Sequence, residues 1–147
     1  MQRTQLTGKA LKFTWAAQIL AAVILGQTLF FKFSGAPESV ELFTTLGVEP
    51  LGRIGLGLVE LVAVVLLLLP RTAALGGLLT LGLMLGAVGS HLTVLGIEVA
   101  GDGGALFGMA VVTALAGGVI AYMRRAELPL IGERLVTAVD RRGSMAG

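Results

Sequence analysis

Residues 51–95 read LGRIGLGLVELVAVVLLLLPRTAALGGLLTLGLMLGAVGSHLTVL, and this stretch decides the fold. Two apolar runs, 51–69 and 73–95, lie on either side of a very short turn at Pro70-Arg71. An α-helix needs roughly 20 mostly apolar residues to cross a bilayer, and each run is about that long. Both runs are rich in Leu, Ala and Gly and lack the alternation of a barrel strand. The stretch therefore predicts two antiparallel transmembrane helices.

Two further runs of the same kind flank this pair, at residues 13–31 and 105–123. Of the 147 residues, 55% are hydrophobic and only 14% are charged. A soluble domain of this size has too little core to hide so many apolar side chains, so lipid is their simplest solvent. The sequence predicts an all-α integral membrane protein in which residues 13–123 form a four-helix bundle.

The connections between these runs carry turn signals. Ser34-Gly35-Ala36-Pro37 ends the first run, and Asp102-Gly103-Gly104 forms a turn before the last. From Glu38 to Leu46 the sequence predicts a short helix at the membrane surface. We expect Val40, Phe43 and Leu46 of this helix to face lipid.

Basic residues indicate how the chain is oriented in the membrane. They gather in the N-terminal segment 1–12, in the turn at Arg71 and in the tail 124–147, whereas the other connections carry Glu and Asp. Because cytoplasmic loops are enriched in Lys and Arg, both termini are predicted to be cytoplasmic, in a multi-pass protein of the cell membrane. From Pro129 onward, the basic cytoplasmic tail reads either as an amphipathic surface helix or as a frayed end.

Several classes of function are excluded or disfavoured by the residues. The chain has no cysteine, so it forms no disulfide and carries out no thiol exchange of its own. No metal site is expected, because the single histidine leaves too few ligands for zinc. The formal net charge of +2 does not indicate nucleic acid, since the basic residues lie mainly at the ends of apolar runs. No phosphate-binding loop and no independent catalytic motif are present, so catalytic residues are not assigned and no intrinsic cofactor is evident.

Small residues recur at four-residue spacing within the apolar runs. One such stripe is Gly82, Gly86 and Ser90, and another is Ala110, Ala114 and Gly118. Small residues let membrane helices approach closely. The stripes therefore fit either ordinary packing within the bundle or a homo-oligomer contact.

Polar residues inside apolar runs are the candidate ligand-binding residues, because ionisable groups in a membrane are costly and usually face the protein interior. With both termini cytoplasmic, all of them fall at mid-depth or in the outer half of the membrane. An ionised Glu60 needs a partner there, and Lys32, Arg53 and His91 are the candidates. The set consists of Glu60, His91, Arg53, Lys32 and Gln27.

Four segments together resemble the DoxX-like membrane proteins. They are GQTLFFKFSG at 26–35, LGVEP at 46–50, LVEL at 58–61 and GAVGSH at 86–91. The resemblance covers about residues 13–123, and Lys32 departs from it by preceding Gly35, where relatives more often have the glycine first. It implies a four-helix membrane protein that is often linked to redox chemistry. Some relatives are described as a subunit of a thiosulfate:quinone oxidoreductase, and others are associated with oxidative-stress or thiol-detoxification complexes.

The leading hypothesis is a redox-associated membrane subunit that binds a quinone, or another lipid-soluble molecule, in a pocket of the outer half. Its expected partners are membrane lipid, a soluble or membrane oxidoreductase and, as an alternative assembly, a second copy of the chain. A small proton-coupled transporter is the first rival, because buried Glu and His also serve proton relays. A non-enzymatic scaffold or lipid-binding protein is the second.

Overall fold

The computed structural model describes residues 6–128. Within them lie four helices that are long and apolar enough to cross a membrane, together with a short helix and no strand. The long helices are α1 (Gly8–Ser34), α3 (Leu51–Leu68), α4 (Ala73–Ser90), which continues into the π-helical turn η1 (His91–Leu95), and α5 (Ala105–Met123). The all-helical membrane fold with four predicted spans is thereby confirmed. The surface helix proposed for the tail lies outside the described residues.

The first helix extends further than the apolar run that predicted it. Hydropathy marks only the apolar part at 13–31, whereas α1 continues through Lys9 and Lys12 at one end and to Ser34 at the other. Gly35 stops the helix in a left-handed conformation with φ of 67°, which glycine adopts without steric cost. Pro37 then opens the short helix α2 (Pro37–Thr45), where its missing N–H costs nothing.

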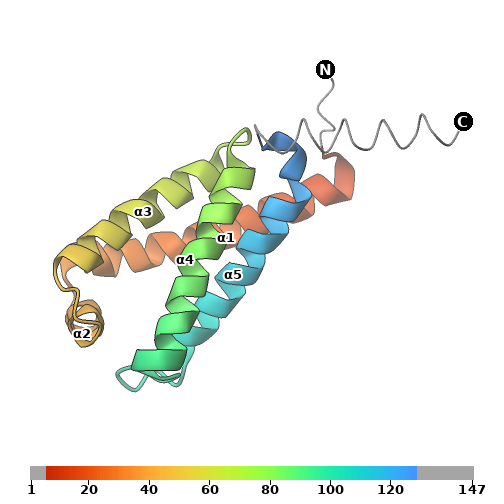
Figure 1. The fold of residues 1–147 in the computed structure, drawn as a ribbon. Coiled ribbons are helices and arrows are strands. Elements are labelled where there is room, and N and C mark those ends of the chain that lie inside the picture. Colours follow the sequence, from red (N-terminus) through yellow and green to blue (C-terminus); the bar gives the residue numbers. More distant parts are fainter. Residues whose placement is uncertain (1–5, 129–147) are drawn as a thin grey trace, which may run out of the picture.

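The four long helices form two arms that meet at one end and diverge toward the other (Figure 1). One arm pairs α1 with α3, and the other pairs α4 with α5, which share the most extensive helix contact. The arms converge where the chain turns between α3 and α4, which we call the narrow end. They diverge toward α2, which we call the wide end. There α2 contacts both α3 and η1, so it lies across the mouth of the two arms.

Adjacent glycines let three helices meet closely near the narrow end. A Cβ atom added at Gly76 would lie 2.7 Å from the backbone nitrogen of Leu67 in α3. One added at Gly77 would lie 2.8 Å from the backbone of α5, at Gly117 and Ala121. No real side chain fits at such distances. The sequence Gly76-Gly77 therefore joins α4 to α3 on one face and to α5 on the next.

A buried arginine closes the narrow end. Arg124, only 4% exposed, donates from Nε to Gln18 of α1 at 2.8 Å and from Nη1 to the carbonyl of Pro70 at 3.3 Å. Its Nη1 also pairs with Glu127 at 2.8 Å, and Gln18 in turn donates to the carbonyl of Leu67. By sequence alone, Arg124 is only one of the basic residues at the start of the cytoplasmic tail. In the structure it links α1, the turn between α3 and α4, and the end of α5.

The prediction that α2 presents Phe43 to lipid is wrong. Phe43 is 5% exposed, and both Phe43 and Leu46 line the space between the two arms. The helix was expected to find its apolar partner in the bilayer. Because the arms diverge, the bundle itself offers that partner, and α2 turns its apolar face inward.

The packing predicts that one added methyl group lowers stability at a closely packed glycine and has no effect at an open one. Gly77→Ala should lower the free energy of unfolding by about 1–3 kcal/mol, as overpacking does, because its Cβ meets backbone that cannot give way. Gly108→Ala on α5 is the matched control, since a Cβ there meets no atom within 4 Å. Thermal unfolding in micelles, followed by circular dichroism, measures both. Equal melting temperatures would contradict the assigned close contact.

Candidate functional site

A cavity of about 870 Å³ lies between the two arms in the half of the bundle toward the wide end. Side chains from all five α-helices and from η1 line it. Most of the wall is apolar, and its larger contributors include Ile24, Leu56, Leu83, Met84, Leu106 and Met109. Ligand sites in proteins are commonly apolar hollows of 300–1,000 Å³ with a few polar groups that fix orientation. The size and lining of this cavity are of that kind.

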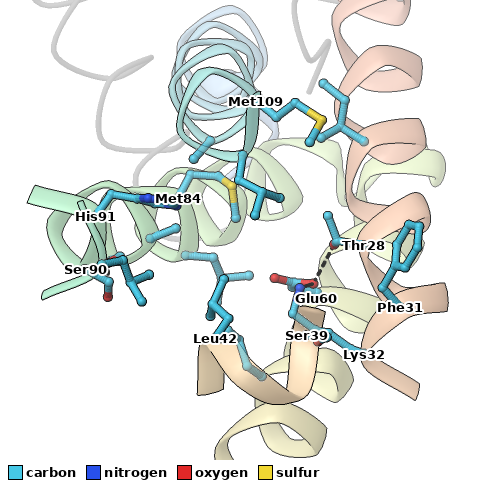
Figure 2. A pocket seen from close by; sticks show the side chains of 18 of the residues that line it. Thr28, Phe31, Lys32, Ser39, Leu42, Glu60, Met84, Ser90, His91 and Met109 are labelled. Atoms are coloured by element: carbon cyan, nitrogen blue, oxygen red, sulfur yellow. Dashed lines mark hydrogen bonds and ion pairs between the residues drawn. The ribbon is translucent and has the colours of Figure 1, made fainter. Parts of the chain in front are cut away.

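One wall of the cavity carries a buried ion pair. Glu60 of α3 is 2% exposed, and its Oε2 lies 2.9 Å from Nζ of Lys32 on α1. The Thr28 hydroxyl, one turn before Lys32, also lies 3.0 Å from Oε2 (Figure 2). The second carboxylate oxygen turns toward the cavity (Figure 2). Of the three partners considered for Glu60, the structure selects Lys32.

The facing wall carries His91, at the point where α4 widens into η1. The imidazole is 5% exposed, and its Nδ1 lies 2.8 Å from the carbonyl of Gly96. A carbonyl only accepts, so Nδ1 must carry a proton and donate it. In the neutral ring, Nε2 is then an acceptor. Phe107 holds the ring edge-to-face at 5.7 Å between centroids, which fixes the orientation of this acceptor.

Arg53 lies apart from this cavity. Its guanidinium pairs with Glu49, with Nη2 to Oε1 at 2.8 Å, and its Nη1 donates to the backbone carbonyl of Lys32. Arg53 was a candidate partner of Glu60, but Glu49, four residues before Arg53, pairs with its guanidinium instead. Arg53 therefore fastens the start of α3 to the end of α1 and holds the backbone of Lys32 in place.

Gln27 does line the cavity, from the exposed side of α1. The structure thus brings Glu60, Lys32, His91 and Gln27 of the candidate set around one space, and leaves Arg53 beside it. Sequence reasoning passed over Thr28, although its spacing of four residues from Lys32 places both on one helical face. It also missed Met84 and Met109, which looked like ordinary core residues.

The glycine stripe of α4 has a role that neither of the expected readings covered. A Cβ at Gly82 or Gly86 would meet no atom within 4 Å, and both residues line the cavity. They pack against no helix of the described chain. The stripe gives the cavity a smooth wall.

Asp102 shapes the rim of the cavity at the wide end. Its carboxylate accepts backbone N–H groups from Leu106, Val99 and Gly104 at 2.8–2.9 Å, and so ties the loop to the first turn of α5. These bonds hold the pKa of Asp102 below the ordinary value of 3.8; nearby His91 lowers it slightly further and burial opposes the shift. Asp102 therefore stays ionised near neutral pH, and its carboxylate is used to hold the loop.

The chain matches the DoxX-like family over residues 16–119. The matched range includes α2, α3, α4 and every described residue that lines the cavity. Neither the curated proteins nor the solved structures contain a significant match to the chain.

The buried ion pair predicts strong coupling between two substitutions. Glu60→Gln leaves the Lys32 ammonium without its counter-charge, and breaking a buried pair in this way costs about 3–5 kcal/mol when no water replaces the partner. The double variant Lys32→Met/Glu60→Gln should lose less stability than the sum of the two single variants, with a coupling energy of about 0.5–3 kcal/mol. Chemical unfolding in mixed micelles measures the cycle. Glu41→Gln, an exposed charge change on α2, is the control, and strictly additive losses would refute the pair.

The loop anchor predicts a dependence of stability on pH. A folded-state pKa below 3.8 means that the contribution of Asp102 is fully present above that pH and is lost as the pH falls through the lowered value. Thermal unfolding of wild type and Asp102→Asn should therefore differ by a constant amount between neutral pH and about pH 5. The difference should shrink in more acidic buffer. A difference that grows on acidification would contradict the assignment.

Proposed function

The chain belongs to the DoxX-like family of membrane proteins, and on that premise we propose that it binds a quinone, or a similar lipid-soluble redox molecule, between its two arms. The observation that carries the proposal is the Lys32–Glu60 ion pair, buried in the wall of a cavity of about 870 Å³ that is otherwise mainly apolar. In this role the protein is the membrane subunit of a quinone-linked oxidoreductase.

The ion pair suits the oxygen of a quinone. Lys32 uses one N–H on Glu60, which leaves ammonium donors for a carbonyl oxygen in the cavity. Glu60 turns its second oxygen to the same space, where it is placed to exchange a proton with a bound ligand (Figure 2). Inside an apolar wall these few polar groups fix the orientation of the ligand, and the apolar side chains hold its ring.

His91 supplies the complementary group on the other wall. With Nδ1 committed to Gly96, Nε2 accepts a hydrogen bond from a hydroxyl group. A ring that carries oxygens at opposite ends would therefore meet a donor at Lys32 and an acceptor at His91. A hydroquinone hydroxyl can donate to Nε2 of His91, whereas a quinone carbonyl only accepts and is therefore bound by the donors of Lys32.

The electrons for such a reaction must come from elsewhere. Quinone reduction takes up two electrons and two protons, and a chain without cysteine and without a redox motif supplies no electrons. An oxidoreductase partner, soluble or membrane-bound, would supply them. With the basic segments placed in the cytoplasm, the wide end and α2 face outward across the cell membrane, so the partner would meet the cavity from that side.

A proton-coupled transporter uses similar residues, but the packing favours binding over transport. Most of the described residues that line the cavity lie toward the wide end, and on α4 the lining begins at Leu78. At the narrow end, close contacts at Gly76 and Gly77 and the buried Arg124 join the helices. Access from one side fits a binding site better than a pathway. A scaffold without a ligand leaves the ion pair in the cavity wall unexplained.

Mass spectrometry of organic extracts from protein purified in lipid nanodiscs tests the proposal. We expect a quinone to be enriched in wild type and reduced about tenfold, the loss of one good polar contact, in Glu60→Gln and in His91→Asn. Asparagine retains an N–H group for Gly96 while removing the Nε2 acceptor, so the second variant tests the ligand contact separately from the loop.

The control is Glu41→Gln, which removes a charge from α2 outside the cavity and should retain the quinone of wild type. All variants must show the melting temperature and elution volume of a folded protein before the extracts are compared. Phospholipid alone in every sample, combined with no uptake of added quinone by the nanodisc-embedded wild type, would refute the proposal. Proton movement driven by a substrate across proteoliposomes would favour the transporter instead.

A further inference from the structure

The two arms separate on the face where α3 passes α4. The contact at Gly76, where an added Cβ would lie 2.7 Å from α3, is a close approach of α4 to α3 near the narrow end. Two turns further on, at Gly82 and Gly86, an added Cβ would meet nothing within 4 Å. Figure 1 shows α3 and α4 moving apart in this direction. The interhelical space thus widens from direct backbone contact to an unfilled gap.

This gap connects the cavity with the outside of the bundle. Gly82, Gly86 and the 43%-exposed Leu78 all line the cavity, although they lie on the outward-facing side of α4. On the opposite side, between α1 and α5, the lining is built from the long side chains of Ile24, Phe31 and Met109. Because these helices span the membrane, the medium beyond the glycine gap is the hydrocarbon of the bilayer.

The volume of the cavity indicates a ligand larger than a ring. An apolar cavity of about 150 Å³ is enough to hold benzene, and this one is about six times as large. Lys32 and Glu60 lie on one wall and His91 on the facing wall, and most of the remaining lining is apolar. The remaining apolar volume suits a chain of methylene or isoprenoid groups that continues from the ring.

We propose that the gap between α3 and α4, floored by Gly82 and Gly86, is a lateral portal, and that the ligand is a long-chain amphiphile whose tail lies in it. The inference rests on the proposed function, in that the head of the ligand binds between Glu60 and His91. The tail then passes over the two glycines and continues into the lipid. Glu60, buried to 2% exposure with an oxygen turned into the cavity, marks the head position.

Glycine suits this position because a tail needs room next to the helix backbone. A larger residue at Gly82 or Gly86 projects its side chain into the gap, since within residues 6–128 no atom lies within 4 Å of an added Cβ there. Gly108 offers the matched comparison, because its surroundings are equally open although it does not line the cavity. A substitution at Gly86 should therefore block the portal without disturbing helix packing. The same substitution at Gly108 should leave both the portal and the helix packing unchanged.

The experiment compares two benzoquinones that differ only in tail length, one with a single isoprenoid unit and one with a long isoprenoid chain. Binding to wild type, Gly86→Leu and Gly108→Leu is measured by equilibrium titration in nanodiscs. We expect Gly86→Leu to weaken the long-tailed quinone about tenfold, or about 1.4 kcal/mol, and to leave the short-tailed one unchanged. Gly108→Leu should bind both as wild type does.

Site-directed spin labels locate the tail directly, because the chain has no cysteine of its own. Nitroxides are placed one at a time through Gly82→Cys, Gly86→Cys, Gly108→Cys and Gln27→Cys, and their collisions with oxygen are measured in nanodiscs. The long-tailed quinone should lower oxygen access at the first two positions only. Protection at Gln27 but not at the glycines would overturn the portal and place the tail between α1 and α5.

The outcomes separate this inference from the function on which it rests. If neither quinone binds the wild type, the proposed function fails. If both bind wild type and Gly86→Leu equally, and the glycine positions show no protection, the head site stands and the portal is wrong. A glycine variant that loses both quinones while keeping its melting temperature would also overturn the portal, because the glycines would then belong to the head site.

Discussion

The close approach of α4 to two helices at once, through Gly76 and Gly77, is the constraint on which the rest of the architecture depends. Membrane helices gain little from the hydrophobic effect against each other, so they associate through backbone proximity and polar contacts. Here both act at one end, where the glycines bring the backbones together and Arg124 joins three segments of the chain. Because the helices are joined at the narrow end, they are free to diverge at the other. The cavity is a consequence of that asymmetry.

The Lys32–Glu60 pair shows how a charged group is tolerated in the diverging half. An isolated carboxylate at this depth is costly, but Glu60 has an ammonium group at 2.9 Å and a hydroxyl group at 3.0 Å. Arg53 acts on the same pair from outside the cavity, since it donates to the backbone carbonyl of Lys32 and takes its own counter-charge from Glu49. The two basic residues thus have different roles. Lys32 faces the cavity, and Arg53 fixes the helix end that presents it.

The sequence was sufficient for the four spans because hydropathy and length act locally, residue by residue. It also singled out Glu60 and His91, both of which line the cavity, since an ionisable group inside an apolar run stands out without any knowledge of packing. Pairing could not be read in the same way. Arg53 lies on the face of Glu60 by helical spacing, yet the turn before α3 brings Glu49 closer. Nor could the inward face of α2 be foreseen, because Phe43 finds an apolar partner only once the arms diverge.

The glycines of α4 show why the same residue type cannot be interpreted without the fold. Gly77 and Gly82 differ little in their sequence surroundings, but one touches backbone on α5 and the other borders empty space. The first makes a close helix contact, so its substitution is expected to affect folding. The second leaves room that no described residue fills, in the lining of the cavity that Glu60 also borders. Under the proposed function, stability and ligand binding depend on different parts of one helix, so a ligand would bind without loosening the contacts that hold the bundle together.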